Sequence, residues 1–189
     1  QGLSQEDQQK KFQGILETLD PEEREQITGK QQCPFCLMAK GEIPVKKVYE
    51  DETLLGILDI RPANKGHTLL FPKEHHRVLS TVPEPLIAHM FSTANKLSTA
   101  IFDAMNAQGT NIHVANGPAA GQTATHVLVN IIPRFTKDKV VIGWHAEKID
   151  ENEIENIPAS IRKKIPKDRP KLTEKKETPT IREGFQRIP

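Results

Sequence analysis

The sequence predicts an α+β fold in which helices pack against an antiparallel five-stranded sheet. Five segments with strand-like alternation predict strands near residues 45–50, 53–60, 67–72, 111–116 and 126–132. A long segment with apolar residues at helical spacing lies between the third strand and the fourth. The chain has 189 residues, of which 36% are apolar, so it can bury one core of ordinary size.

Two helices are expected to accompany these strands. The first lies near residues 83–106, where seven residues repeat at helical spacing and should face the sheet: Leu86, Ile87, Met90, Phe91, Ala94, Leu97 and Ile101. The second helix is expected near residues 150–164. This combination of strands and helices is the pattern of an α+β domain, which we expect to span residues 33–165.

Residues 1–32 predict a helical N-terminal arm. Ser4 and Asp7 form a capping-box pattern, and Pro21 after Asp20 marks a second helix start. The first helix would carry one apolar stripe, formed by Phe12, Ile15, Leu16 and Leu19. Such stripes are usually buried against their own domain, so a packed extension is the simplest interpretation of this arm.

Residues 166–189 predict an extended, basic, proline-rich tail. Repeated prolines among charged residues cannot maintain a helix or bury a core. From residue 160 onward the chain carries ten Lys or Arg against four Asp or Glu. This charge favours an anionic partner, either RNA in a ribonucleoprotein or an acidic protein surface. The alternative is a solvated tail that only raises solubility.

Composition excludes two classes of protein. No apolar run is long enough to span a membrane, and no basic start followed by an apolar stretch suggests a secretory signal. The chain has two cysteines, both in one Cys-x-x-Cys pair, and thus no disulfide framework. These features predict a cytoplasmic protein.

The segment from His126 to Arg134 alternates as a strand does. His126, Leu128 and Asn130 should share one face of this strand, opposite a face formed by Val127, Val129 and Ile131. The segment resembles the signature of the histidine triad (HIT) family, in which His recurs at three alternate positions before an apolar pair, Pro and Arg. Here only the first His is present, and Leu128 and Asn130 stand at the second and third positions.

The resemblance covers about two-thirds of the chain, from about Cys33 to about Ile165. Its further blocks are Cys33-Pro34-Phe35-Cys36, Gly41-Glu42-Ile43-Pro44, Val48-Tyr49-Glu50-Asp51-Glu52, Leu58-Asp59-Ile60-Arg61-Pro62, residues 65–75 and residues 116–123. It implies the HIT-like antiparallel five-stranded sheet with packed helices. Since family members commonly pair through a continuous sheet, it also implies a homodimer.

A zinc site is implied by the same resemblance. Cys33 and Cys36 are spaced for metal binding, and His75 and His126 match the remaining zinc ligands of family members with an N-terminal Cys-x-x-Cys. A closed shell of four thiolate and imidazole ligands is structural, not catalytic. The alternative is a thioredoxin-like redox pair, but this pair lacks the βαβ context that such a motif requires.

The chemistry of the family is not expected here. In full triads the middle His attacks the α-phosphorus of a nucleotide derivative, but Leu128 has no lone pair and Asn130 cannot become cationic. No other histidine is expected to take the place of Leu128, whether His67, His76, His89, His113 or His145. His113 lies on the adjacent predicted strand, but its position alternates with that of Asn116, which should face the pocket, so His113 is expected on the other face.

The binding half of the family's site is better kept. Asp59 matches the acid that contacts the ribose, and Asn116, Gln122 and Thr123 match residues that line the phosphate region. The alternative is that Asp59 caps a turn and the rest is ordinary loop chemistry. Leu128 would oppose nucleotide binding if it fills the space that a phosphate requires. A buried phosphate needs hydrogen-bond or charge partners, and a leucine side chain supplies none.

The sequence therefore predicts a catalytically silent HIT-fold protein with structural zinc. It would act as a partner-binding scaffold, in the manner of a ribonucleoprotein component, or as a sensor of a purine nucleotide. The alternative is a divergent nucleotidyl hydrolase or transferase acting on nucleotide phosphoramidates or dinucleoside polyphosphates through a displaced His or direct attack by water.

Overall fold

The computed structural model describes residue 18 and residues 33–166, without the side chain of Asn152. The predicted N-terminal arm, except residue 18, and the predicted tail beyond residue 166 lie outside the described residues. The chain divides between Val141 and Ile142 into two compact units. Each unit is described by itself.

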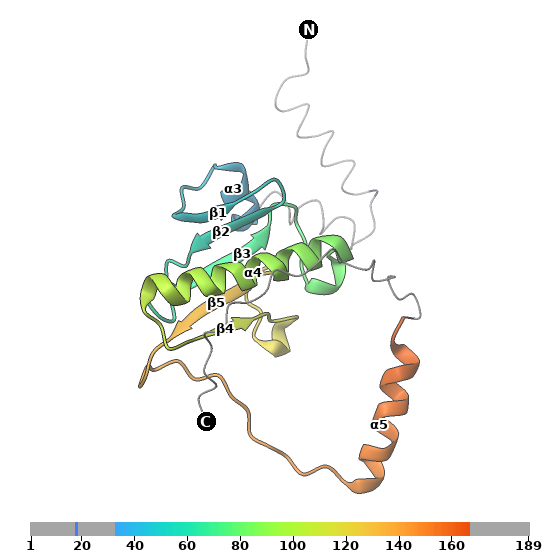
Figure 1. Cartoon of the computed structure of the whole chain (residues 1–189). Helices are drawn as coiled ribbons and strands as arrows, with labels where there is room; N and C mark the ends of the chain where they lie inside the picture. Colours follow the sequence, from blue (N-terminus) through green and yellow to red (C-terminus); the bar gives the residue numbers. More distant parts are fainter. Residues whose placement is uncertain (1–17, 19–32, 167–189) are drawn as a thin grey trace, which may run out of the picture. The chain divides into compact units, whose positions relative to one another are not determined.

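Between residues 33 and 141 the first unit contains five strands and four helical segments. In chain order they are α3 (Pro34–Lys40), β1 (Lys47–Glu50), β2 (Leu54–Leu58), β3 (Thr68–Pro72), η1 (Leu79–Thr81), α4 (Glu84–Met105), β4 (Gly109–His113), η2 (Pro118–Ala120) and β5 (Val129–Arg134). The strands form one sheet in the order β1-β2-β3-β5-β4, and each neighbouring pair is antiparallel (Figure 1). The predicted fold class is confirmed.

The ends of the strands differ from the sequence prediction, and two of these differences concern the residues beside the pocket. The last strand was expected from residue 126, but β5 begins at Val129. The reason is that Val127 N–H donates to the carbonyl of His76 at 2.7 Å, so this part of the backbone is bonded to a loop and not to the sheet. The fourth strand was expected at residues 111–116, but β4 ends at His113, the residue paired with Asn130.

The sheet separates two apolar clusters. On one face α4 contributes Met90 and Ala94 to a core that includes Leu54, Leu70, Val129 and Ile131, all fully buried. The other cluster contains Leu55, Ile57, Leu69 and Phe71, with Phe35 and Met38 of α3 and with Leu128 packed against it. The predicted alternation is therefore observed, because Val129 and Ile131 face α4 while Leu128 faces the opposite way.

Helix α4 is the long helix predicted from apolar spacing. It begins after Pro83 and ends where Asn106 adopts a left-handed conformation, with φ of 49°. Its inner side follows the prediction except for Phe91, which is 38% exposed. The exposure follows from position, since residue 91 lies about 100° around the helix from the fully buried Met90.

The second unit contains α5 (Glu151–Lys164), where a helix was predicted near residues 150–164. Three of its isoleucines are exposed, as are Trp144 and Ile149 before it. Among the helices that the structure describes, none is long and apolar enough to cross a membrane.

Candidate metal centre and adjoining pocket

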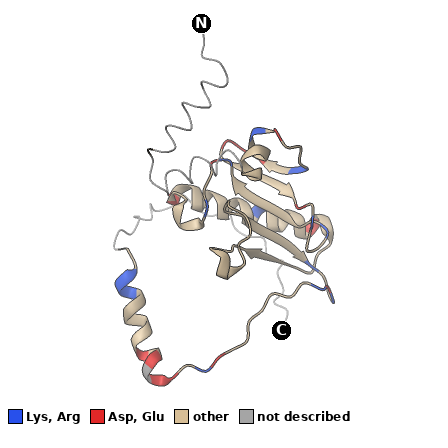
Figure 2. Ribbon diagram, turned by 180° about the vertical axis from the view of Figure 1, so that it is seen from behind, with Lys and Arg blue, Asp and Glu red and all other residues tan. Residues whose placement is uncertain are grey.

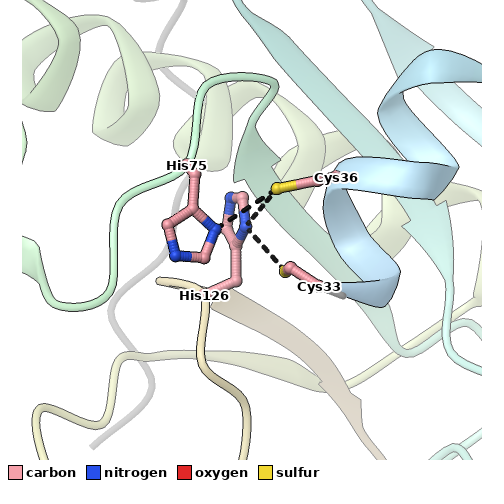
Figure 3. Close-up of side chains that lie close together, drawn as sticks. All are labelled: Cys33, Cys36, His75 and His126. Atoms are coloured by element: carbon pink, nitrogen blue, oxygen red, sulfur yellow. Dashed lines mark hydrogen bonds between the residues drawn. The ribbon is translucent and has the colours of Figure 1, made fainter. Parts of the chain in front are cut away.

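Four potential metal ligands from three segments meet beside α3. Cys33 precedes the first residue of α3, and Cys36 follows within its first turn. His75 lies in the loop after β3, and His126 lies just before β5. One potential ligand atom from each residue lies within 4.8 Å of all the others (Figure 3).

The distances in this cluster fit a single tetrahedral ion. The Cys33 sulfur lies 3.4 Å from His126 Nδ1, and the Cys36 sulfur lies 3.2 Å from His75 Nδ1 and 3.8 Å from His126 Nδ1. Ligands about 2.0–2.3 Å from one tetrahedral ion are separated by roughly 3.3–3.8 Å. These three sulfur–nitrogen distances are close to that spacing.

The ring of His126 is held in the state that binds metal. Its Nε2–H donates to the carbonyl of Pro72 at 2.9 Å, which leaves the lone pair on Nδ1 facing both cysteines. The ring is completely buried, and burial is the main cause that lowers its pKa to about 4. It therefore stays neutral at pH 7, as a metal ligand must be. Phe35 and Phe71 pack against its edges.

A pocket of about 210 Å³ adjoins this cluster. The described residues that line it are His113, Ala115, Gly121, Gln122, Thr123, Ala124, His126, Leu128, Asn130 and Ile132. His126 belongs to both the pocket and the metal cluster. Leu128 and Asn130, at the second and third triad positions, line the pocket but do not belong to the metal cluster.

Neither of these two residues offers a nucleophile to the pocket. Leu128 is partly buried and packs on the cluster around Phe71. Asn130 Oδ1 lies 3.2 Å from His67 Nε2, and Asn130 Nδ2 donates to the carbonyl of His113 at 3.4 Å. The amide of Asn130 therefore connects His67 to the strand of His113, which lines the pocket.

His67 is neutral in this arrangement. Its Nδ1 accepts a hydrogen bond from the backbone N–H of Ala63 at 3.2 Å, so the ring proton lies on Nε2 and is donated to Asn130. Burial is the main cause that lowers the pKa of His67, although Asp59 and Asn130 oppose this shift. The 3.5 Å approach of Asp59 to His67 Nδ1 is consequently not an ion pair.

The four predicted nucleotide contacts are divided between pocket and loops. Gln122 and Thr123 line the pocket, but Asp59 and Asn116 are not among the described residues that do. Asp59 accepts the N–H of Arg61 at 2.8 Å, and Asn116 accepts that of Leu79 at 2.9 Å.

Gln122 is occupied as well. Its side chain accepts from Gly117 N–H at 2.7 Å and donates to the carbonyls of Arg77 and Ala124. The loop that borders the pocket is thus fixed by the side chain that the sequence assigned to ligand binding.

His113 lines the pocket, although the sequence prediction placed it on the wrong face. It is paired directly with Asn130 across the β4–β5 ladder, and directly opposed residues project to the same side of a sheet. The wrong prediction counted alternation back from Asn116, but β4 ends at His113 and alternation does not continue past it. Only the pairing register between the two strands reveals this histidine.

A buried carboxylate that the sequence prediction did not single out closes the end of β5. Asp138 binds Arg134 through both oxygens at 2.8 Å and also accepts from Asn64 and from backbone N–H groups. Arg134 and these backbone bonds keep the pKa of Asp138 well below its usual range.

Comparison with known families gives one match, to the HIT domain, over residues 40–137. These 98 residues are more than half of the chain. The chain belongs to the HIT family. The matched HIT region includes His75 and His126 but begins after Cys33 and Cys36, so half of the metal cluster lies outside it.

Curated HIT relatives include proteins with and without an assigned activity. The protein named Hit of Bacillus subtilis is 38% identical over 71% of this chain and 95% of its own. An adenylylsulfatase of Arabidopsis thaliana is 38% identical over 66% of this chain and 62% of its own. An adenosine 5'-monophosphoramidase of Schizosaccharomyces pombe is 33% identical over 70% of this chain and 98% of its own.

Solved HIT structures match the same part of the chain. A HIT family member from Bacillus subtilis has a TM-score of 0.68 at 36% identity, covering 72% of this chain and 99% of its own. A zinc-bound histidine triad protein from Mycobacterium smegmatis has a TM-score of 0.56 at 33% identity, covering 71% of this chain and 96% of its own.

Proposed function

We propose that this HIT-family chain binds a nucleoside phosphate without transferring its nucleotidyl group, on a fold held by structural zinc. The observation that carries the proposal is the pair of residues on the pocket wall, Leu128 and Asn130. A phosphoryl transfer that proceeds through a covalent intermediate needs a lone pair in reach of phosphorus. Leu128 has none, and the amide of Asn130 has no basic nitrogen and is already hydrogen-bonded.

The size of the pocket suits part of a nucleotide. Pockets that enclose a whole small ligand have volumes of about 300–1,000 Å³, and this one has about 210 Å³. A phosphate with the adjoining ribose would occupy it, and the base would lie outside. Gly121 and Thr123 would supply backbone and hydroxyl donors to the phosphate, and Asp59 and Asn116 would reach the ligand only if their turns opened.

Zinc is the metal that we propose for the cluster. Cys33, Cys36, His75 and His126 form a complete set of four ligands, so a bound ion would have no open position for a substrate. The metal would connect the start of α3, the loop after β3 and the start of β5. Its role would be to stabilise the pocket wall that His126 shares.

The remaining parts of the proposal concern partners and location. We propose a homodimer, and an anionic partner, RNA or an acidic protein, for the basic tail, which lies outside the described residues. A cytoplasmic location agrees with the lack of a disulfide between Cys33 and Cys36, since thiols remain reduced there.

Titration of the zinc-loaded protein with AMP and GMP tests the binding half of the proposal. Saturable binding at one nucleotide per chain is expected in calorimetry, with zinc measured on the same sample. Incubation with adenosine phosphoramidate and adenylyl sulfate tests the proposed lack of catalysis, and no AMP should be released. Release of AMP would contradict the proposal that the chain is catalytically inactive. Absence of binding would contradict the proposal that it binds a nucleotide.

A second candidate function is hydrolysis with a displaced nucleophile. It is favoured by His113, whose side chain lines the same pocket as Leu128 and lies opposite Asn130 in the β4–β5 register. The relatives named adenylylsulfatase and monophosphoramidase supply the substrates to assay. If AMP is released, replacement of His113→Asn should abolish release, whereas His89→Asn, on α4, should not.

A further inference from the structure

Helix α5 carries its isoleucines in one exposed stripe. Ile154, Ile157 and Ile161 are spaced by three and four residues, and Ile165 follows one turn later; they are 40–57% exposed. At about 100° per residue these four side chains fall within a sector of about 80°. An apolar face of this kind is stable in water only when something covers it.

The charges of α5 are divided between its ends. Glu151 and Glu153 lie in the first turn, and Arg162, Lys163 and Lys164 lie in the last (Figure 2). Acids at the start and bases at the end also suit the dipole of an isolated helix. That effect alone, however, does not determine on which side of the stripe each charge lies.

The flank of the isoleucine stripe on which each charged residue lies indicates what kind of partner covers the stripe. Glu151 and Arg162 are eleven residues apart, which is about three turns, so they lie on the same flank of the stripe. Glu153 and Lys164 are also eleven residues apart and share the other flank. Each flank thus has an acid at the beginning of the helix and a base at its end.

We propose that α5 pairs in antiparallel orientation with α5 of a second copy of this chain. In an antiparallel, two-fold symmetric pair each flank faces the same flank of the partner, reversed in direction. Glu151 then lies beside the partner's Arg162, and Glu153 beside the partner's Lys164. With the axis between Ile157 and Pro158, Ile154 packs on the partner's Ile161. A parallel pair would instead place acids beside acids.

Charge complementarity selects a second copy over other occupants. The order of charges on α5 is complementary to its own reverse, so two identical helices pair Glu151 with Arg162 and Glu153 with Lys164, and Glu155 remains as an additional acid on the flank of Glu151. The other apolar stripe predicted in the chain, in residues 1–32, belongs to an arm with seven acids and four bases. Because acids predominate in this arm, it would pair well with the bases of α5 but would place acids beside Glu151 and Glu153.

Photocrosslinking in the full-length chain tests which occupant covers the stripe. A photoreactive phenylalanine derivative at position 157 should crosslink to residues 154–161 of another copy, identified by mass spectrometry with one copy isotope-labelled. Crosslinks to residues 1–32, or only to residues 33–141, would overturn the proposal. This measurement reports on α5 whatever other contacts two copies make.

Charge reversal tests the antiparallel arrangement. Arg162→Glu should lower the crosslink yield about tenfold, because it places two acids together twice in each pair. Lys163→Glu is the matched control, since Lys163 lies on the face opposite the stripe, and its yield should be unchanged. Circular dichroism checks that each variant keeps its helix.

Mixing two variants gives the decisive result. The variant Glu151→Arg should crosslink as poorly as Arg162→Glu when each is alone. A mixture of the two should recover the parent's yield within about threefold, because every flank contact is again between opposite charges. Failure of the mixture to recover, while both variants stay folded, would overturn the antiparallel pairing.

Discussion

The metal cluster and the pocket share one short segment, yet they have kept their family residues to different degrees. His126 is present and completely buried, whereas two residues later, on the same face, Leu128 stands where the family has its nucleophile. His126 contributes to a set of ligands from three distant segments. The loss of any ligand would weaken the whole fold, but the loss of a nucleophile removes only a reaction.

The substitution at position 128 is also favourable for packing. Leu128 lies against the cluster of Leu55, Ile57, Leu69 and Phe71. Complete burial of a leucine side chain contributes about 1.5–3 kcal/mol, and a partly buried one contributes a fraction of this. Under the proposed function, this strand has exchanged a chemical group for apolar packing at one position, while the proposed metal ligand beside it remains.

Removal of a metal ligand should have the largest effect. Cys36→Ser leaves three ligands around the ion, and structural zinc contributes on the order of 10 kcal/mol in zinc-finger peptides. The variant should lose one equivalent of zinc and melt at a much lower temperature than the parent. Metal analysis and a thermal melt on the same sample measure both effects.

The control for this variant is the neighbour of another ligand. His76→Gln changes a partly buried histidine next to His75 but leaves the four ligands intact, so the protein should keep its zinc. A chelator should lower the melting temperature of the parent and of His76→Gln, but not that of Cys36→Ser. Full zinc content in Cys36→Ser would show that Cys36 is not a zinc ligand, and the contrast drawn between the metal cluster and the pocket would then fail.

Restoring the triad tests the other region. Leu128→His together with Asn130→His should produce measurable release of AMP from adenosine phosphoramidate, because a positioned nucleophile and proton donor return to the pocket. A rate about 10²-fold above the uncatalysed background is the scale of one positioned acid–base group. The rate of AMP release by chromatography gives the result.

The single variant Asn130→His is the matched control, since it leaves Leu128 in the nucleophile's place and should gain nothing. If the double variant is folded, keeps zinc and still releases no AMP, then the pocket differs from that of active relatives in more than two side chains.

Much of the fold could be predicted because it depends on local patterns. Alternation located the five strands, and helical spacing located α4 and α5 to within about one residue at each end. The metal cluster was also accessible, since Cys33 and Cys36 are close in sequence and the family resemblance supplied the two histidines that the structure brings together with them.

The pocket was harder to predict because it depends on pairing between strands. His113 lines the pocket only through its register with Asn130, and no pattern within one strand contains that information. The same holds for Gln122, whose side chain bonds backbone groups of loops that meet only in the folded chain. Asp59 shows the converse, because the turn contact weighed as an alternative is present.

Removal of the carboxylate at the end of β5 should have a smaller and pH-dependent effect. The side chain of Asp138 is 6% exposed, and its pKa is lowered chiefly by Arg134. A lowered pKa means that the ionised carboxylate stabilises the fold above the unfolded pKa of about 4, and that this contribution is lost as the pH falls further. Asp138→Asn should therefore melt below the parent at neutral pH.

The gap in melting temperature between Asp138→Asn and the parent should be similar at about pH 7 and pH 5 and narrower at about pH 3. Both proteins lose metal in acid, so only the gap is interpreted. The matched control is Asp103→Asn, at the end of α4, whose gap should be small at every pH. If the difference in melting temperature between Asp138→Asn and the parent is unchanged in acid, then lost packing, not lost charge, explains the lower stability of the variant.

The smallest effect is expected from Asn130→Asp, which places a carboxylate where His67 now donates to an amide. The distance between His67 Nε2 and the present oxygen of Asn130 is 3.2 Å. Burial lowers the pKa of His67 in the parent, so stability that depends on neutral His67 is present above the usual histidine pKa of about 6.5 and is lost below it. An adjacent anion reverses this preference, because it stabilises the charged ring.

The sign of the pH dependence is therefore the test. In the parent, protonation of His67 opposes folding as the pH falls from about 8 to about 6. In Asn130→Asp a raised pKa of His67 makes the same protonation favour folding, so the variant should gain stability relative to the parent over this range. Chemical shifts of the His67 ring in NMR titrations measure the pKa directly. An unchanged pKa would mean that the aspartate turns away from His67, and the bond between the pocket wall and His67 would then depend on the amide alone.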